Sequence, residues 1–184
     1  MRAFRYLSVG MMLVASVASA QTAADHIALG DKEYVAMSAP AALAHYEEAI
    51  KVDPKSYEAL WKASRSAVDL GSFDRNDKTR ENYFKSAELY SRRAVEVNPG
   101  DAEGHFNLAR SLGKNALTQG PRARIKYATD VRVHALECLK INPKHPGCLH
   151  VMGMWNAEVM RLNGFTRMMA KNLLGERTMT SGKT

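Results

Sequence analysis

Apolar residues recur at helical spacing along most of the chain, and short polar turns separate the apolar stripes. One stripe comprises Ala42, Tyr46, Ala49 and Ile50, which follow one another at separations of one to four residues. Residues spaced in this way share one face of an α-helix, so the pattern predicts amphipathic helices that bury one side. The hydrophobic pattern therefore indicates an all-α protein.

Three similar turns punctuate the stripes at nearly constant distance. They are Val52-Asp53-Pro54, Val97-Asn98-Pro99 and Ile141-Asn142-Pro143, and their prolines are separated by 45 and 44 residues. The residue before a proline disfavours the α conformation, so a helix is expected to end at each turn. A regular period of this size is typical of a helical repeat array.

The stripes and turns together predict the helices. Ser38 is expected to cap a helix that has Pro40 in its first turn, Gly71 to end another, and Asp101 to cap a third. Between them, residues 72–82 form a polar segment that we expect to be an exposed loop. The predicted helices are 25–37, 38–53, 57–70, 83–97, 102–116, a long helix that follows Gly120-Pro121 and the basic segment 122–126 and runs to 141, then 147–162 and a short amphipathic helix 165–174.

Small residues occupy the same register in successive repeats. Ten residues after each proline stand Ser64, Ala109 and Gly153, and five residues before it stand Ala49, Ala94 and Cys138. Helices approach closely only where small side chains lie at the crossing, which predicts antiparallel helix hairpins stacked face to face. A large side chain at Gly153 is then expected to overpack the crossing.

Three segments resemble tetratricopeptide repeats: ALAHYEEAIKVDP, YEALWKASRSAVDLG and AEGHFNLARSLG. The spacing departs from the usual period of about 34 residues, and insertions at 72–82 and around 120–126 would account for the difference. The resemblance implies an all-α fold of stacked antiparallel helix hairpins, a TPR-like α-solenoid with loop insertions.

The stretch from Arg110 to Gly175 resembles the C-terminal half of the regulator of microtubule dynamics family, and the earlier repeats do so more loosely. In that family a further repeat helix follows this segment, whereas here the chain ends. The apolar face of helix 165–174 then lacks its expected partner. That end is mobile, or covered by a second copy in a homodimer through this uncapped helix, or the product of a shortened gene.

The first twenty residues differ from the rest. Arg2 and Arg5 precede an apolar run, and Ala18-Ser19-Ala20 is a small-x-small cleavage site, the pattern of a secretory signal peptide of bacterial type. The run falls short of the ~20 residues that span a bilayer. We expect a signal peptide (1–20), a TPR-like domain (21–175), a polar tail (176–184) and a periplasmic or secreted protein with no transmembrane segment after cleavage. Export would keep the chain from cytosolic microtubules, so microtubule binding is not carried over.

Charge is distributed unevenly. From Arg110 onward there are 13 basic and 4 acidic residues, a net charge of +9, within a chain of formal net charge +7. Such a region attracts acidic partners or anionic surfaces. One alternative function is therefore an accessory domain that docks electrostatically on an anionic envelope surface. No nucleic-acid motif accompanies the basic residues, so we expect no nucleic-acid binding.

Histidines and cysteines gather near the last turn, at His134, Cys138, His145, Cys148 and His150. Thiolate and imidazole are zinc ligands, but the spacing matches no established zinc pattern. A Cys138–Cys148 disulfide is more plausible in an exported protein. We expect two buried free thiols ahead of either alternative, and no metal or other cofactor. The methionines Met152, Met154, Met160, Met168 and Met169 are expected to lie mostly in the core.

Repeats of this kind expose a concave surface lined by the first helix of each hairpin. Seven and eleven residues after the prolines, that surface would present Trp61 and Arg65, Phe106 and Arg110, and His150 and Met154. An apolar or aromatic residue beside a cation suits a peptide with acidic groups. Because no catalytic constellation is visible, the sequence predicts an exported non-catalytic scaffold that binds a partner protein or peptide in this groove.

Overall fold

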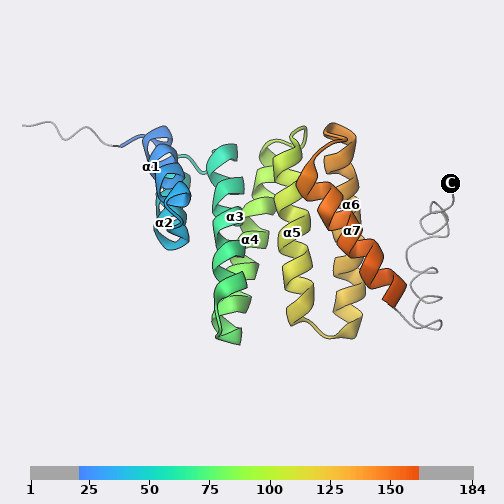
Figure 1. Ribbon diagram of the computed structural model, residues 1–184. Coiled ribbons are helices and arrows are strands. Elements are labelled where there is room, and N and C mark those ends of the chain that lie inside the picture. Colours follow the sequence, from blue (N-terminus) through green and yellow to red (C-terminus); the bar gives the residue numbers. More distant parts are fainter. Residues whose placement is uncertain (1–20, 162–184) are drawn as a thin grey trace, which may run out of the picture.

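Seven α-helices and no strand make up the part of the chain that the structure, a computed structural model, describes, residues 21–161 (Figure 1). The predicted all-α class is confirmed. The helices are α1 (Ala23–Val35), α2 (Ala39–Val52), α3 (Tyr57–Phe73), α4 (Asp77–Val97), α5 (Ala102–Thr118), α6 (Pro121–Ile141) and α7 (Pro146–Arg161).

The helices form a row of hairpins. Each helix packs against the next in the chain, and the odd-numbered helices also contact one another, α1 with α3, α3 with α5 and α5 with α7. In Figure 1, α3, α5 and α7 lie toward the viewer with α4 and α6 behind them. This arrangement is the predicted TPR-like α-solenoid. We call the side formed by α1, α3, α5 and α7 the odd-helix face.

Local chemistry explains where the helices begin. Thr22 and Asp25 form a capping box at α1, and Asp101 caps α5 as predicted by accepting the backbone N–H of Glu103. Ser38 precedes α2, but its side chain makes no capping hydrogen bond. Proline in the first turn of α2 and of α6 removes an N–H that would otherwise be unsatisfied.

The prediction of an exposed loop at 72–82 is wrong, because most of this segment is helical. α3 continues to Phe73 and α4 begins at Asp77, where Asn76 accepts the backbone N–H groups of Lys78 and Thr79. Gly71 does not end α3 but lies inside it, where an added Cβ would come within 2.6 Å of the Phe84 ring. Polar residues here cover the exposed side of a helix. At the other expected insertion α6 begins directly at Pro121, so longer helices rather than loops lengthen the repeat.

Small side chains build the core between the helices, and five of the six predicted small positions are buried, namely Ala49, Ser64, Ala94, Ala109 and Cys138. Gly153 is the exception, because it is exposed and an added Cβ would meet nothing within 4 Å. The close contact is at Gly147 instead, where an added Cβ would lie 2.3 Å from the Phe106 ring. α7 is inclined to α5 and α6 in Figure 1, so its N-terminal turn, not its middle, makes the tight crossing.

The expectation of two free thiols is also wrong. Cys138 near the end of α6 and Cys148 in the first turn of α7 form a disulfide with a Cα–Cα distance of 6.4 Å. Both residues are fully buried. The short turn between the two helices brings the Cα atoms into the range that a disulfide needs.

Several expectations concern residues outside 21–161, namely the signal peptide, helix 165–174 with its homodimer contact, the polar tail, Met168 and Met169. Of the described methionines, Met152 packs at the edge of the core, whereas Met154 and Met160 are exposed, so the prediction of a mostly buried set fails for these two. None of the helices from α1 to α7 is long and apolar enough to cross a membrane.

Candidate functional site

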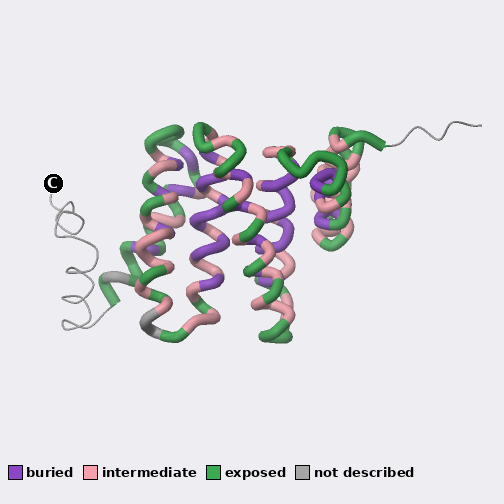
Figure 2. Tube along the Cα trace, turned by 180° about the vertical axis from the view of Figure 1, so that it is seen from behind, coloured by how far each residue is buried: buried purple, intermediate pink, exposed green. Residues whose placement is uncertain are grey.

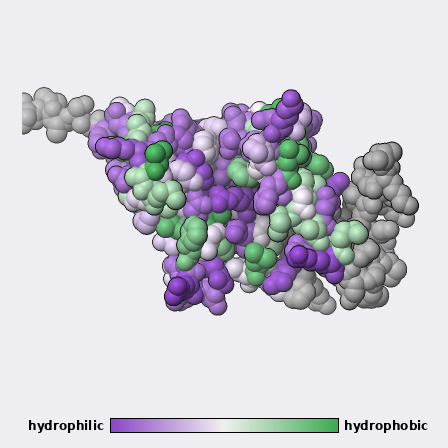
Figure 3. Space-filling model, in the orientation of Figure 1, coloured by the Kyte–Doolittle hydropathy of each residue, from purple (hydrophilic) through white to green (hydrophobic). Residues whose placement is uncertain are grey.

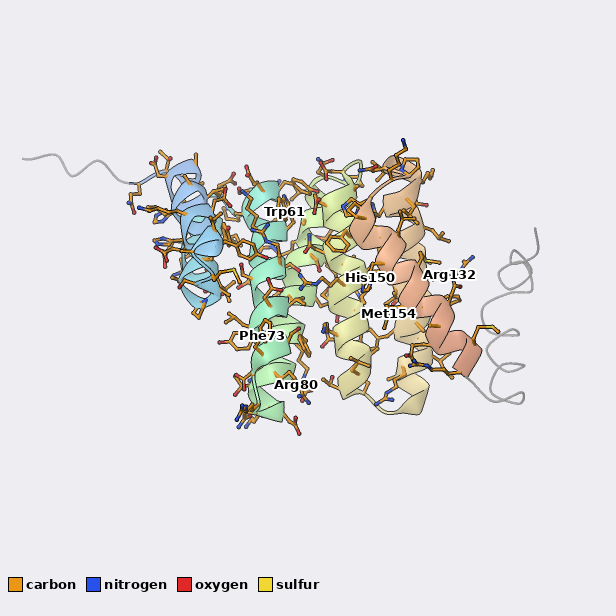
Figure 4. All side chains as sticks on the ribbon, viewed as in Figure 1. Trp61, Phe73, Arg80, Arg132, His150 and Met154 are labelled. Atoms are coloured by element: carbon orange, nitrogen blue, oxygen red, sulfur yellow. A yellow bond between two sulfur atoms is a disulfide. The ribbon has the colours of Figure 1, made fainter. Side chains whose placement is uncertain are left out.

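The predicted site residues divide among three helices of the odd-helix face. Trp61 and Arg65 belong to α3, Phe106 and Arg110 to α5, and His150 and Met154 to α7. Figure 4 places Trp61, His150 and Met154 on the side toward the viewer. Their surroundings differ, however, and only part of the set forms one continuous cluster.

Trp61 and Arg65 lie together, one helical turn apart on α3. The Arg65 guanidinium lies 3.6 Å from the centre of the Tyr34 ring of α1 and 5.1 Å from that of Trp61. Cations over aromatic faces are attracted by the ring quadrupole. A second contact is a long hydrogen bond of 3.4 Å from Arg65 Nη2 to the Tyr46 hydroxyl. The predicted pairing of an aromatic side chain with a cation is therefore present at this position.

Asp69 links three helices, because its carboxylate accepts hydrogen bonds from Tyr34 of α1 at 2.9 Å and from Arg110 of α5. Lys114 follows one turn after Arg110. Burial, and then the neighbouring Arg110 guanidinium, lowers the pKa of the Lys114 ammonium, while Asp69 acts in the opposite direction. We call Tyr34, Trp61, Arg65, Asp69, Arg110 and Lys114 the charged cluster. Its three cations and one carboxylate leave a net charge of +2.

A network of ion pairs lies next to this cluster, between α1 and α3. Lys62 is 6% exposed and binds both Asp31 of α1 and Glu58 one turn before it. Asp31 also accepts the Tyr46 hydroxyl at 2.8 Å. Burial raises the pKa of Asp31, but the hydrogen bonds from Lys62 and Tyr46 outweigh it, and the net shift is downward. α1 is therefore joined to α3 by charged groups as well as by packing.

Phe106 does not offer a free aromatic surface. Its ring packs against Gly147, and its centroid lies 4.9 Å from that of the His145 ring. Phe106 also contacts the buried residues around Cys138 and Cys148. It is therefore a contact between α5 and the start of α7.

His150 and Met154 are exposed on α7, one helical turn apart. Met154 and Leu149 expose apolar side chains on α7, whereas His150 is polar. In Figure 3 hydrophobic residues gather toward the α7 side of the view, and hydrophilic residues predominate between α3 and α5. Nothing in the described structure brings His150 or Met154 into the charged cluster. The predicted groove therefore consists of a polar part on α1, α3 and α5 and an apolar part on α7.

Sequence reasoning missed three members of the charged cluster, Tyr34, Asp69 and Lys114. Asp69 and Lys114 stand fifteen residues after Pro54 and Pro99, one turn beyond the register of Arg65 and Arg110. Extending the register by a turn would have found both, since residues four apart share a helix face. Tyr34 lies before the first repeat turn and had no register to reveal it.

Two surface hollows of the described structure lie away from the charged cluster. One is beside Asp25 on α1, and the other lies between the turn at Pro54 and Arg93 near the end of α4. Neither hollow is lined by members of the charged cluster. The cluster itself is spread over α1, α3 and α5, and such an extended surface is suited to a protein ligand more than to an enclosed small molecule.

Comparison with known proteins agrees with the fold. A thermophilic TPR protein of Thermus thermophilus superposes with a TM-score of 0.59 at 20% identity, over 84% of this chain and 67% of that one. At this identity the likeness concerns the fold alone.

Sequence relatives are regulator of microtubule dynamics protein 1 from Bos taurus and from Homo sapiens. Each is 26% identical, over 117 residues (63% of this chain) and 114 residues (61%) respectively. The aligned part spans only 37% of the bovine and 36% of the human protein. The sequence profile of the family described as regulator of microtubule dynamics protein 1-3 matches residues 22–183, almost the whole chain. The chain therefore belongs to the regulator of microtubule dynamics protein 1-3 family.

Proposed function

We propose that this protein is an exported, non-catalytic scaffold whose odd-helix face binds an acidic segment of a partner protein. The observation that carries the proposal is the charged cluster, where Asp69 pairs with Arg110 and lies near Lys114 while Arg65 is held by the rings of Tyr34 and Trp61, across helices that pack side by side. TPR-like solenoids offer extended faces of this kind to other proteins.

The cluster offers complementary contacts for such a segment. Lys114 has no hydrogen-bond or ion-pair partner among residues 21–161, where Asp69 pairs with Arg110 instead. A carboxylate that approached Lys114 would reduce its repulsion with Arg110. Trp61, which lies beside Arg65 in the same cluster, provides apolar contact area. Aromatic residues and arginine are the side chains that most often dominate binding energy. The expected ligand therefore carries a carboxylate next to an apolar side chain.

Export is part of the same proposal. It rests on the signal-like pattern of the first twenty residues, and the family profile begins at residue 22, just after the expected cleavage site. Disulfide formation between Cys138 and Cys148 fits an oxidising compartment. Fractionation of cells with the mature N-terminus determined by mass spectrometry tests this part, and a chain that keeps residues 1–20 in the cytosol contradicts it.

Peptide selection tests the binding face. A random peptide library is selected against the purified protein, and dissociation constants are measured by fluorescence anisotropy. We expect selected peptides rich in Asp and Glu. We also expect Lys114→Glu to weaken binding at least about tenfold, equivalent to about 1.4 kcal/mol, because a like charge would face the ligand.

The matched control is Lys85→Glu, which makes the same charge change on α4, where Lys85 pairs with Glu81. Equal weakening by both substitutions would contradict the proposal, as would peptides without acidic residues. Salt distinguishes docking on an anionic surface, since purely electrostatic binding fades above physiological ionic strength. Peptide binding through Trp61 and the charged cluster is expected to persist in part at high salt, because it includes apolar contacts.

A further inference from the structure

Three metal-ligating side chains meet where α6 turns into α7. One donor atom each from Cys138, His145 and Cys148 lies within 4.8 Å of the other two, and all three residues are buried. We call these residues the thiol–histidine cluster. The sequence spacing matches no established zinc pattern, and only the fold reveals that the three donors converge.

The hydrogen bonds of His145 settle its tautomer. Nδ1 lies 3.2 Å from the backbone N–H of Cys148 and accepts from it, so the ring proton is on Nε2. Nε2 lies 3.2 Å from a carboxylate oxygen of Glu103 on α5 and donates to it. Metal-binding histidines commonly donate one ring N–H to a carboxylate, as Nε2 does here, and bind the metal through the other nitrogen. The single lone pair of Nδ1 accepts the Cys148 N–H in this structure, so a bound metal would replace that hydrogen bond.

We propose that, once the disulfide is reduced, the thiol–histidine cluster binds Zn²⁺ through the Cys138 and Cys148 sulfurs and His145 Nδ1. A dithiol reductant supplies the two electrons: the S–S bond breaks, both cysteines become thiols and the reductant becomes a disulfide. When Zn²⁺ enters, each thiol loses its proton to solvent and forms a Zn–S bond. Two thiolates balance the charge of the ion, and water completes the coordination.

The dimensions and burial of the cluster suit this ion. Tetrahedral zinc holds sulfur at about 2.3 Å and imidazole nitrogen at about 2.0–2.1 Å. The three donor atoms lie within 4.8 Å of one another, which is near enough to share one ion once the two sulfurs are no longer bonded and have moved apart. Both cysteines are 0% exposed and His145 is 7% exposed. Buried thiolates are costly without a counter-ion, and Zn²⁺ supplies one.

The oxidised and metal-bound states exclude each other, because sulfurs joined in a disulfide are not thiolates and thiolates are the ligands. Each state links α6 to α7 at the same place. The cluster would therefore exchange a covalent link for a metal link according to the redox state, with Glu103 of α5 acting as a positioning residue.

Spectroscopic titration tests the proposal. The full-length protein is reduced with a phosphine, which is then removed under argon, and Co²⁺ is added as a coloured substitute for Zn²⁺. We expect near-ultraviolet sulfur-to-cobalt absorption that rises to one equivalent and disappears when Zn²⁺ is added. The oxidised protein and the Cys138→Ser/Cys148→Ser double variant are expected to give no such absorption.

Single variants test the ligand set. His145→Ala is expected to weaken Co²⁺ binding more than tenfold, and Glu103→Gln by about 10–100-fold, the usual effect of losing a carboxylate that orients a ligand. His150→Ala is the matched control, because His150 is exposed five residues further along the chain, and it is expected to leave binding unchanged.

The proposal is overturned if the reduced wild type binds Co²⁺ and Zn²⁺ no more tightly than the double variant does, or if His145→Ala and His150→Ala behave alike. Should reduction lower the helical circular dichroism, one equivalent of Zn²⁺ is expected to restore it in the wild type but not in the double variant. Failure to restore it also overturns the proposal.

Discussion

The α3–α4 hairpin and the α6–α7 hairpin are held together in different ways. In α3, Leu60, Ala63, Ala67 and Val68 are fully buried in the largest core cluster. In the described part of α7, the buried residues are Cys148 and Trp155, whereas Leu149, Met154 and Met160 are exposed. Figure 2 shows the same contrast, with buried residues concentrated in the central helices and exposed ones along α7.

This difference predicts that repeats of similar sequence are not equally stable. The α3–α4 pair rests on dispersed packing of small side chains, with Gly71 against Phe84. The α7 helix is held by the disulfide, by the contact of Gly147 with Phe106 and by Trp155, whose indole donates to the Ala128 carbonyl at 2.7 Å. Local stability varies within one fold, and segments with few buried contacts are the first to open.

Matched leucine substitutions give the largest expected difference between the two hairpins. Leu60→Ala is expected to lower the free energy of unfolding by about 2–5 kcal/mol, because it leaves a cavity in the core. Leu149→Ala, at a side chain that is 52% exposed, is expected to change it by less than about 0.5 kcal/mol. Urea denaturation followed by circular dichroism measures both. Similar losses would contradict the contrast between the two hairpins.

Reduction of the disulfide is expected to affect the two hairpins differently. A cross-link that closes so short a loop stabilises by about 2–3 kcal/mol, and its loss is expected to act mainly on α7. In metal-free buffer, hydrogen exchange measured by mass spectrometry should quicken in α7 while α3 stays protected. Equal acceleration in both helices would mean that the disulfide supports the whole stack.

Two glycines of α7 provide a third test. Gly147→Ala is expected to destabilise by about 1–3 kcal/mol, since its Cβ would collide with the Phe106 ring. Gly153→Ala is expected to stabilise by up to about 1 kcal/mol, because alanine favours the helix and the site is open. Thermal unfolding distinguishes the two signs. If Gly153→Ala destabilised the protein and Gly147→Ala did not, the close helix crossing would lie at Gly153, as the repeat register predicts.

The smallest expected effect concerns pH. His134 Nδ1 lies 3.1 Å from His105 Nδ1. Burial, then His105 and Arg92, lowers the pKa of His134 below 6.5, although Asp130 and Glu137 act in the opposite direction. The unfolded chain therefore binds more protons than the folded one, and stability is lost as pH falls below 6.5.

His134→Gln is expected to flatten this pH dependence, with His150→Gln as an exposed control. Urea midpoints recorded between pH 7.5 and 5.5 measure the slope. A slope that is the same in wild type and His134→Gln would show that the His105–His134 pair does not contribute to it.

Much of the fold could be predicted from the sequence because helical periodicity and the Asp-Pro and Asn-Pro turns act locally. The repeat register also placed Ala49, Ala94 and Cys138 in the core. The repeat register predicted a close helix crossing at Gly153, and this prediction failed. The inclination of α7 depends on what packs against it, and no local sequence pattern encodes this inclination. The loop prediction at 72–82 failed because polar residues are as compatible with the exposed side of a helix as with a loop.

The candidate site was predictable only in part, for a related reason. Arg65 and Arg110 share the register eleven residues after the prolines, Trp61 lies one turn before Arg65, and the fold places all three in the charged cluster on α3 and α5. Phe106 shares the register of Trp61, seven residues after the proline, yet the first turn of α7 covers it. The disulfide and the position of His145 depend on how α6 turns into α7. Sequence spacing alone could not show whether Cys138 and Cys148 are bonded or free.

The central claim is that partners bind the odd-helix face, and photo-crosslinking in the native compartment tests it most directly. Benzoylphenylalanine is placed at Trp61, or at Leu89 of α4, an exposed position that is 58% accessible, and crosslinked peptides are identified by mass spectrometry. We predict a discrete acidic partner segment crosslinked from position 61, absent from position 89 and lost in the Lys114→Glu variant. Crosslinks from position 89 alone, or crosslinks from position 61 that Lys114→Glu leaves unchanged, would contradict the account.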